Sequence, residues 1–429
     1  MSSSAARPLR VLQVNTFDSV GGAARVARNL FEIYRSRGHD SWLAVGHRQS
    51  RDPNVLSLAV EGAGSSVLQR VLKAVEFQLG IEDLRFSGSE HLLEMVGRVP
   101  DILHAHNLHG GYFDLRAIAP LSQRLPVVLT LHDAWLLSGH CGHSLDCERW
   151  RTGCGHCPDL TLDPPVRRDA TAYNWRRKAR IFDASRLHVA TPSRWLMDKV
   201  DDSMLAPAAV ERVVIPNGVD LSIFKPGDRR AAREALALPP DAKVLLFSAY
   251  ALRQNVWKDF KTVRTALGIA AERLPQDDLV LVALGEGGPA ERIGRAHARF
   301  VPYQGDPAVV ADYYRAADAY VHATRADTFP NTVMEALACG TPVVATAVGG
   351  IPEQIDEGQT GFLAPSGDAE ALAARLVRLL SDDALSHAMS RHAADAARRR
   401  FDLQRQADAY LAWYGQLSTG PASAAATNR

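Results

Sequence analysis

The chain alternates short apolar runs with amphipathic helical patterns, and this alternation restricts its fold more than any other feature. A first series of runs, each bounded by turn signals, lies at 9–16, 42–46, 102–106, 127–132, 187–191 and 213–216. A second series follows at 244–249, 279–284, 299–303, 319–323 and 342–347. Strands separated by helices favour parallel sheets with ligands at the carboxyl ends of the strands. We therefore expect an α/β protein with two doubly wound, Rossmann-like domains facing a central cleft.

The length and the turn signals place the domain boundaries. A chain of 429 residues is too long for one ordinary core. Pro, Gly and Asp cluster at 217–227, so we predict domains at 1–220 and 221–400. A last helix is expected at 401–417, followed by a small, polar tail at 418–429 that we expect to be disordered.

Charge and hydropathy disfavour two classes of partner. The formal net charge is +1, so no overall basic field attracts nucleic acid. The N-terminal MSSSAARPLRVLQVNTF has no apolar segment of signal-peptide length, and no apolar run approaches the ~20 residues of a membrane span. A cytoplasmic location is the default expectation.

The stretch Ala326–Glu353, ADTFPNTVMEALACGTPVVATAVGGIPE, carries the clearest signals for a ligand. Thr328 suits a helix N-cap and Pro330 suits the first turn. We expect a short helix that ends near Ala338 and stops at Gly340.

This helix presents groups suited to a phosphate and a diol. The N–H groups of Asn331, Thr332 and Val333 would point out of the helix start, where the helix dipole favours an anion. Glu335 lies one turn deeper on the face of Asn331, where a carboxylate suits a diol such as ribose. The alternative is a buried helix whose Glu335 caps a neighbouring loop.

Three sequence signatures resemble one enzyme family. Asp327, seven residues and Glu335, continuing as EALACGTPVVATAVGGIPE, resemble the retaining glycosyltransferases of family 4, which have the GT-B fold. VIPNGVDLSIFKP, at 214–226, resembles the segment with which that family enters its second domain. PDILHAHNLHGGYF and VVLTLHDAW, at 100–113 and 127–135, resemble its first domain. The resemblance spans most of the chain in the expected order.

The resemblance implies transfer of a sugar from a nucleotide sugar to a glycan or lipid-linked acceptor with retention of anomeric configuration. It suggests a role in bacterial surface or exopolysaccharide biosynthesis. In the family, the leaving phosphate is thought to accept the acceptor's proton, while cations and helix dipoles offset its charge, so catalysis needs no metal. A nucleotide-sugar epimerase of the GT-B fold and a catalytically silent nucleotide-sugar-binding scaffold remain as alternatives.

The resemblance also implies roles for charged and polar residues. Arg253 and Lys258 are expected to clamp the donor diphosphate, although each could be a solvated surface charge. Asp327, where the family usually has glutamate, is shorter by about 1.5 Å and is expected near the hydroxyls of the donor sugar. His132 resembles a histidine that contacts the transferred sugar, and Asp133 is a candidate to orient it.

Adjacent glycines follow the first apolar run. In FDSVGGAARVARNL, Gly21 and Gly22 do not fit the G-x-G-x-x-G pattern, which disfavours a dinucleotide-binding dehydrogenase. They allow the backbone of a helix start to approach a diphosphate or an acceptor hydroxyl. An ordinary turn is the alternative, and the resemblance favours ligand contact.

Four of the five cysteines lie in a predicted insertion at 140–158, with the spacing C-x5-C-x6-C-x2-C. Such clustering in a cytosolic protein favours a metal over disulfides. We predict a tetrahedral structural zinc site on these thiolates, with His140, His143 or His156 as a substitute ligand, and free or reversibly oxidised thiols as the alternative. The four thiols are those of Cys141, Cys147, Cys154 and Cys157.

Two further segments suggest weak peripheral contact with the inner face of a membrane. NWRRKARIF, from Asn174, combines basic and apolar residues, and SVLQRVLKAVEFQL, from Ser66, is amphipathic. Solvated helix faces are the alternative. The helix at 401–417 resembles the family's C-terminal helix that crosses back to the first domain, and Tyr410, Trp413 and Tyr414 would then pack there.

Overall fold

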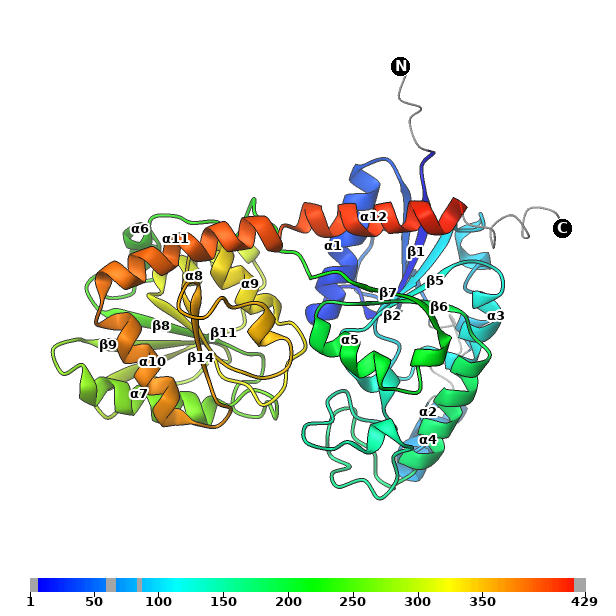
Figure 1. The fold of residues 1–429 in the computed structure, drawn as a ribbon, viewed down its shortest axis with the longest axis horizontal. Coiled ribbons are helices and arrows are strands. Elements are labelled where there is room, and N and C mark those ends of the chain that lie inside the picture. Colours follow the sequence, from blue (N-terminus) through cyan, green and yellow to red (C-terminus); the bar gives the residue numbers. More distant parts are fainter. Residues whose placement is uncertain (1–6, 59–66, 83–86, 420–429) are drawn as a thin grey trace, which may run out of the picture. The chain divides into compact units, whose positions relative to one another are not determined.

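The computed structural model describes residues 7–58, 67–82 and 87–419 and divides the chain into two compact units. Unit 1 comprises Met1–Ile215 and Gln406–Arg429, and unit 2 comprises Pro216–Arg405 (Figure 1). The last helix, α12 (Leu403–Thr419), therefore begins in unit 2 and ends in unit 1. Helix α12 extends two residues past the predicted end at 417, and the rest of the predicted tail lies outside the described residues.

Unit 1 is a parallel sheet flanked by helices. Its strand order is β3-β2-β1-β4-β5-β6-β7, and every pairing is parallel. The strands are β1 (Arg10–Phe17), β2 (Asp40–His47), β3 (Val55–Ser57), β4 (Ile102–Ala105), β5 (Val127–Thr130), β6 (Leu187–Thr191) and β7 (Ala209–Val214). The helices are α1 (Gly22–Ser36), α2 (Val67–Leu79), α3 (Ile118–Ser122), α4 (Thr171–Asp183) and α5 (Arg194–Asp201).

Alternate residues of the unit 1 strands face two different environments. Leu12 and Val14 of β1 join a large apolar core that includes residues of α4 and α5. Gln13, between them, is buried on the opposite face with His104 of β4. There, Tyr414 of α12 hydrogen-bonds to His104 Nδ1 at 2.6 Å, and Tyr410, also of α12, hydrogen-bonds to Thr130 of β5. The buried face that carries Gln13 therefore includes polar side chains of β1, β4 and β5, beside an apolar cluster that Leu43 and Val45 of β2 form with α1.

Unit 2 has the same architecture with one antiparallel edge. Its strand order is β10-β11-β9-β8-β12-β13-β14, in which β10 alone pairs antiparallel with its neighbour. The strands are β8 (Lys243–Ser248), β9 (Leu279–Gly285), β10 (Glu291–Ile293), β11 (Ala296–Pro302), β12 (Ala319–His322), β13 (Val343–Thr346) and β14 (Gly361–Ala364). The helices are α6 (Arg229–Ala235), α7 (Phe260–Arg273), α8 (Pro307–Ala316), α9 (Asn331–Ala338), α10 (Ala369–Leu380) and α11 (Asp383–Arg400).

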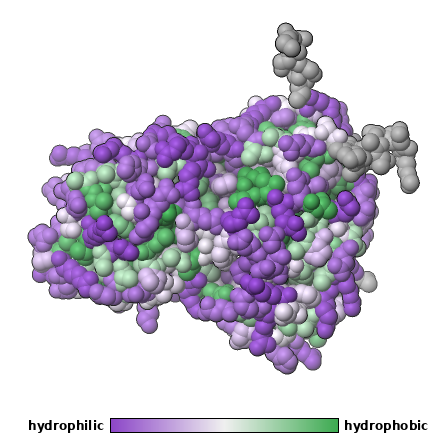
Figure 2. Space-filling model, viewed as in Figure 1, coloured by the Kyte–Doolittle hydropathy of each residue, from purple (hydrophilic) through white to green (hydrophobic). Residues whose placement is uncertain are grey.

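The two faces of the unit 2 sheet pack against different helices. Val244 and Leu246 of β8 belong to one core with residues of α6, α8, α9 and α11. Leu245 and Phe247 belong to a second core with residues of α7 and α10, and Figure 1 shows these helices on opposite sides of the strands. Polar residues cover most of the face shown in Figure 2, as expected when apolar side chains are buried in such cores.

The α/β fold class is confirmed by these two doubly wound sheets. The expected long strands all form, with ends shifted by a few residues. Strands β3, β10 and β14 were not predicted, because each spans only three or four residues at or next to a sheet edge.

Candidate active site

Two predicted residues form an ion pair in unit 2 where the strand order reverses. Strands β8 and β12 are neighbours there, and ligands of such sheets bind at the carboxyl ends of the strands at this point. Lys258 follows β8 and Asp327 follows β12. Lys258 Nζ donates to Asp327 Oδ2 at 2.7 Å, and the side chains are 17% and 20% exposed.

The backbone around Lys258 is fixed on both sides. Its N–H donates to Asn255 Oδ1 at 3.1 Å, and Lys258 forms an antiparallel bridge with Thr324. Thr324 Oγ1 donates to the Trp257 carbonyl at 2.7 Å, and Asp259 caps α7 by accepting from the Thr262 N–H. The lysine is thus held between the start of α7 and the segment that follows β12.

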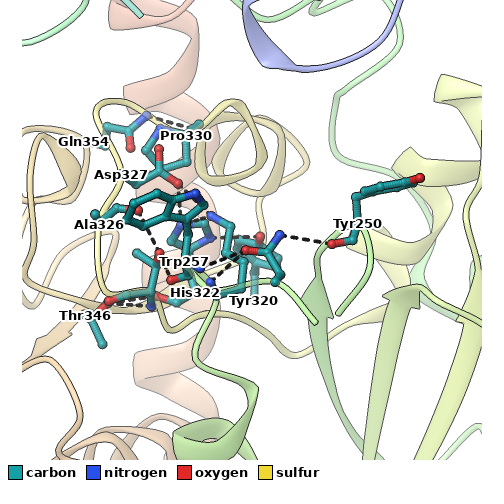
Figure 3. A network of polar contacts seen from close by, with 12 residues as sticks. Tyr250, Trp257, Tyr320, His322, Ala326, Asp327, Pro330, Thr346 and Gln354 are labelled. Carbon is teal, nitrogen blue, oxygen red and sulfur yellow. Dashed lines mark hydrogen bonds and ion pairs between the residues drawn. The ribbon is translucent and has the colours of Figure 1, made fainter. Parts of the chain in front are cut away.

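A buried histidine, which the sequence analysis did not single out, completes this cluster. His322 Nε2 lies 3.3 Å from Lys258 Nζ and 3.4 Å from Asp327 Oδ2, and Nδ1 lies 3.1 Å from the Tyr320 hydroxyl (Figure 3). Burial, reinforced by the Lys258 charge, lowers the pKa of His322 to about 4. Burial alone would raise the pKa of Asp327, but Lys258 and His322 together hold it well below its usual range. At neutral pH the cluster is a carboxylate and an ammonium beside a neutral imidazole.

Helix α9 starts where expected but uses a different cap. Its N-cap is Pro330, at φ −62° and ψ 126°, with no side-chain hydrogen bond, so the prediction of Thr328 as the cap was wrong. The fixed φ of proline already suits a helix entry. Gln354 Nε2 donates to the Pro330 carbonyl at 3.1 Å. Asn331 opens the helix and accepts a hydrogen bond of 3.3 Å from Asn217 Nδ2, so two of the sequence signatures meet at this point.

Other predicted donor contacts lie within α9. Thr332 and Val333 occupy its first turn, and the Thr332 side chain hydrogen-bonds to Tyr320. Glu335 is 3% exposed, and its Oε2 accepts from the Tyr314 hydroxyl at 3.0 Å. A diol that binds Glu335 would therefore meet a carboxylate already oriented by Tyr314 of α8.

Close backbone packing beside Asp327 explains one glycine of the signature. Gly349 has φ 58°, and a Cβ there would lie 1.8 Å from the Asp327 carbonyl oxygen. The next residue, Gly350, donates its N–H to the same oxygen at 3.3 Å. A larger residue at 349 would displace Asp327 from Lys258.

In unit 1 the strand order reverses between β1 and β4. Gly21 is the N-cap of α1 with φ 96°, and a Cβ there would meet no atom within 4 Å, so its conformation is what requires glycine. Gly22 opens α1. A cavity of about 440 Å³ lies beside this loop, lined by Asp18, Ser19, Arg25, Arg28, Asn29, Gln49 and Ser50.

His132 follows β5 and is half-buried. Its Nε2 lies 3.0 Å from His106 Nδ1, and burial lowers the pKa of His132 to about 4. Asp133, which we expected to orient His132, pairs with His109 Nε2 at 3.0 Å and accepts from the Trp135 N–H. The residue that contacts His132 Nε2 in the structure is His106.

Comparison with known families matches both units of the chain. The description "Glycosyltransferase Family 4" matches residues 20–223, and "Glycosyl transferases group 1" matches residues 242–382. Between them, the two matches cover most of both units. The first match lies almost wholly in unit 1 and the second lies in unit 2, so each unit resembles a domain of a glycosyltransferase.

Several curated relatives of this chain are named as glycosyltransferases. The D-inositol 3-phosphate glycosyltransferase of Actinosynnema mirum is 38% identical over 225 residues, covering 49% of this chain and 52% of the relative. The chain thus spans about half the length of the inositol-phosphate relatives it matches. The putative colanic acid biosynthesis glycosyl transferase WcaC of Escherichia coli K12 is 26% identical over 353 residues, covering 79% of this chain and 83% of the relative.

Solved structures support the GT-B fold of this chain. Sucrose-phosphate synthase from Thermosynechococcus elongatus has a TM-score of 0.65 at 21% identity, covering 95% of this chain and 98% of that one. Anabaena Alr3699/HepE, in complex with UDP-glucose, has a TM-score of 0.63 at 18% identity, covering 95% and 100%. At these identities the likeness concerns the fold alone.

Arg253 lies in a cluster separate from that of Lys258 and Asp327. Its NH1 pairs with Glu286 Oε1 at 2.6 Å, its N–H donates to Glu286 Oε2, and its guanidinium lies 4.3 Å from the centre of the Phe300 ring. The side chain is 42% exposed. A role at the donor diphosphate stays a prediction and would require Arg253 to leave Glu286.

The cysteine-rich insertion brings its four thiols to one place. All four are free and half-buried, and they line a small cavity of about 20 Å³ together with His140. His140 Nε2 lies 3.3 Å from Cys157 Sγ, and the Gly139 N–H donates to Cys154 Sγ at 3.3 Å. Burial raises the pKa of Cys141 to about 11 and that of Cys154 to about 12.

Zinc in this cavity stays a prediction. Across residues 7–58, 67–82 and 87–419, no group of three or more His, Cys, Asp or Glu side chains is arranged to hold a metal ion. Binding would require the thiols to lose their protons and to draw together.

Proposed function

We propose that the chain transfers a glycosyl group from a nucleotide-sugar donor to a glycan or lipid-linked acceptor, with retention of anomeric configuration, in bacterial surface or exopolysaccharide biosynthesis. The names of its relatives support this class of reaction: one acts on an inositol phosphate and another belongs to colanic acid biosynthesis. The complexes of HepE with UDP and UDP-glucose support a nucleotide sugar as the donor.

The single observation that carries the proposal is the Lys258–Asp327 pair at the reversal point of the unit 2 sheet. A donor diphosphate would bring negative charge that competes with Asp327 for Lys258. The released carboxylate could then accept from hydroxyls of the sugar, with His322 as its neighbour at 3.4 Å. On this account the lysine offsets the charge of the leaving diphosphate, and the N–H groups at the start of α9 assist it.

Thermal stabilisation by a panel of UDP, GDP, ADP and dTDP sugars tests the donor site, with Glu335→Ala as the variant. Ligand at about 100 times its Kd adds about 2.7 kcal/mol. We expect one nucleotide class to stabilise the wild type and the variant to lose that effect. Stabilisation by no donor would contradict the proposal.

Acceptor-dependent release of nucleotide then separates transfer from the alternatives. An epimerase of the GT-B fold would consume a nucleotide sugar without acceptor, and a silent scaffold would bind it without turnover. Retention is tested by the anomeric configuration of the product, determined by NMR. An inverted product would contradict that part of the proposal.

We further propose that unit 1 binds peripherally to an anionic membrane that contains a lipid-linked acceptor. Exposed apolar residues line α2: Val71, Val75, Phe77 and Leu79 are 50%, 43%, 44% and 38% exposed. Beside this helix, a cavity of about 190 Å³ is lined by Arg116, Tyr173, Arg176, Arg177, Arg180 and Ile181. The two features are joined by Asn174 of α4, the helix that carries five of the six lining residues: Asn174 Nδ2 donates to the carbonyl of Gly80, which directly follows α2, at 2.8 Å. Apolar side chains next to clustered arginines suit a bilayer that contains anionic lipids.

Co-sedimentation with vesicles tests this contact. We expect binding to vesicles that contain phosphatidylglycerol and little binding to vesicles of phosphatidylcholine alone. The double variant Arg176→Glu and Arg180→Glu should lose binding, whereas the matched double variant Arg292→Glu and Arg295→Glu in unit 2 should keep it. Equal binding by both variants, or none by the wild type, would contradict the proposal. Within the described residues, no helix is both long and apolar enough to span a membrane.

A further inference from the structure

A chain of buried hydrogen bonds runs through unit 1 to His132. Gln13 Oε1 of β1 lies 3.0 Å from His106 Nε2, and His106 Nδ1 lies 3.0 Å from His132 Nε2. Gln13 is 0% exposed and His106 is 1% exposed. The three residues come from successive strands of the sheet order β1, β4 and β5, or from the loops that follow them.

The order of donors and acceptors in this chain follows from elementary chemistry. Burial, together with the neighbouring His104 and His132, holds the pKa of His106 well below its usual range, so its ring is neutral with one N–H. The Gln13 amide is oriented with its oxygen towards His106 and its buried Nε2 without a hydrogen-bond partner. In this orientation the oxygen can only accept, so the proton of His106 lies on Nε2. His106 Nδ1 must then accept, and His132 Nε2 must donate to it.

We propose that Gln13 and His106 are positioning residues that fix His132 in the tautomer with its proton on Nε2. The Nδ1 of His132 is then the acceptor nitrogen, suited to a hydroxyl of the transferred sugar. This role of His132 rests on the proposed function, whereas the tautomer itself does not.

The surroundings favour a neutral pair. The ring of His104 lies 4.0 Å from that of His106, and both nitrogens of His104 are engaged, by Tyr414 at 2.6 Å and by Thr130 at 2.7 Å. The titratable groups around the pair are His104 of β4, Asp133 and His109 beyond β5 and β4, Tyr410 and Tyr414 of α12, and Tyr34 of α1. Asp133, the one carboxylate among them, already pairs with His109.

NMR of the 15N-histidine-labelled full chain tests the proposal without any ligand. The chain has 15 histidines, and the His132→Asn variant identifies the signals of His132. We expect the shifts of His132 in the wild type to show a bare Nδ1 and a protonated Nε2 at pH 7. A proton on Nδ1 would overturn the proposal, whatever the enzyme's activity.

A pair of variants separates positioning from structural support. Gln13→Met keeps the size of the side chain but removes the acceptor, so we expect mixed tautomers at His132. Thr130→Val removes a hydrogen bond from the same buried face, and we expect His132 to be unchanged. If Gln13→Met leaves the His132 signals unchanged, or if Thr130→Val alters them equally, Gln13 and His106 do not fix the tautomer of His132.

Binding extends the test to function. With the nucleotide sugar that stabilises the wild type, Gln13→Met should raise Kd by the inverse of the fraction of His132 rings that keep the proton on Nε2, a fraction that the NMR spectra measure. An even mixture of tautomers gives about a twofold rise, and a fraction of about one tenth gives about a tenfold rise. The Kd of the matching nucleoside diphosphate should not change, because that ligand lacks the sugar. Equal losses for both ligands would contradict the sugar contact and leave the tautomer result standing.

Discussion

In unit 2, the strands at the reversal point of the sheet present an ion pair, Lys258 with Asp327. In unit 1, the strands at the reversal point and their neighbour present neutral imidazoles, His106 with His132. Both clusters are largely withdrawn from water, but one keeps two opposite charges together and the other excludes charge. The same topology therefore supports two kinds of polar site, one suited to an anionic group and one to a neutral hydroxyl.

Replacing Lys258, the cation of the charged cluster in unit 2, should give the largest loss of turnover. Lys258→Ala removes the cation that would face the diphosphate and leaves Asp327 without its partner at 2.7 Å. We expect turnover to fall by about 10²–10³-fold, as when one preorganised charge donor is lost. Steady-state release of nucleotide is the measurement. Lys261→Ala, an exposed lysine in the first turn of α7, is the matched control and should be near normal. A near-normal rate for Lys258→Ala would remove this lysine from the site.

The sequence predicted the charged cluster far better than the neutral one. Lys258 and Asp327 carry charges in segments that resemble a family signature, so their type and spacing were informative. His322, by contrast, is a single polar residue at the end of an apolar strand and resembles an ordinary core residue. Gln13 and His106 are separated by 93 residues, and only the strand order β1-β4 brings them together. No local pattern contains that pairing.

The same limit explains the errors at α9 and at the sheet edges. The capping preference of Thr328 was a sound local signal, but the chain turns into the helix two residues later, at Pro330, whose carbonyl is held by Gln354. Strand β14, GFLA, is short, and it pairs with β13 so closely that a Cβ at Gly361 would lie 2.0 Å from the Val343 carbonyl oxygen. Tertiary packing overrides local preference at both places.

Acid titration should distinguish the neutral, buried histidines of unit 1 from the ionised Asp327 of unit 2. Burial lowers the pKa of His104 to about 3, from an unfolded value of about 6.5. Below pH 6.5 the unfolded chain binds this proton and the folded chain does not, so stability is greatest above pH 6.5 and falls as pH decreases towards 3. Each such histidine contributes about 1.4 kcal/mol per pH unit.

Urea unfolding of the wild type and of His104→Gln between pH 7 and pH 4 measures this slope. We expect the free energy of unfolding of His104→Gln to depend less steeply on pH than that of the wild type, with a slope smaller by about 1.4 kcal/mol per pH unit. The variant should also be less stable than the wild type at pH 7. The Asp327 carboxylate, whose pKa is lowered, affects stability only at a more acidic pH, below about 3.8. An unchanged slope in His104→Gln would contradict a neutral, buried His104.

Metal analysis tests whether the cysteine-rich insertion of unit 1 binds zinc. We predict one zinc per chain in protein purified under reducing conditions, bound by the four thiols around the small cavity. Chelation should lower Tm by about 2–4 °C for each kcal/mol of metal stabilisation lost. Cys154→Ser should lose the zinc, whereas Cys339→Ser, at a buried cysteine in unit 2, should retain it. Protein without zinc that keeps its Tm after chelation would favour the free thiols.

The smallest effect is expected from lengthening the acidic side chain of the ion pair. Asp327→Glu restores the residue usual in the resembling family and moves the carboxylate by about 1.5 Å. Because Lys258 is flexible, the ion pair can follow this change, and total turnover should remain within a few-fold of the wild type. The carboxylate would then reach different sugar hydroxyls, so the ratio of kcat/KM between two donors of the preferred nucleotide should change about tenfold. An unchanged ratio with full activity would mean that Asp327 serves Lys258 alone. Asp327 would then act on the ligand only through Lys258, just as Gln13 and His106 in unit 1 are proposed to act only through His132.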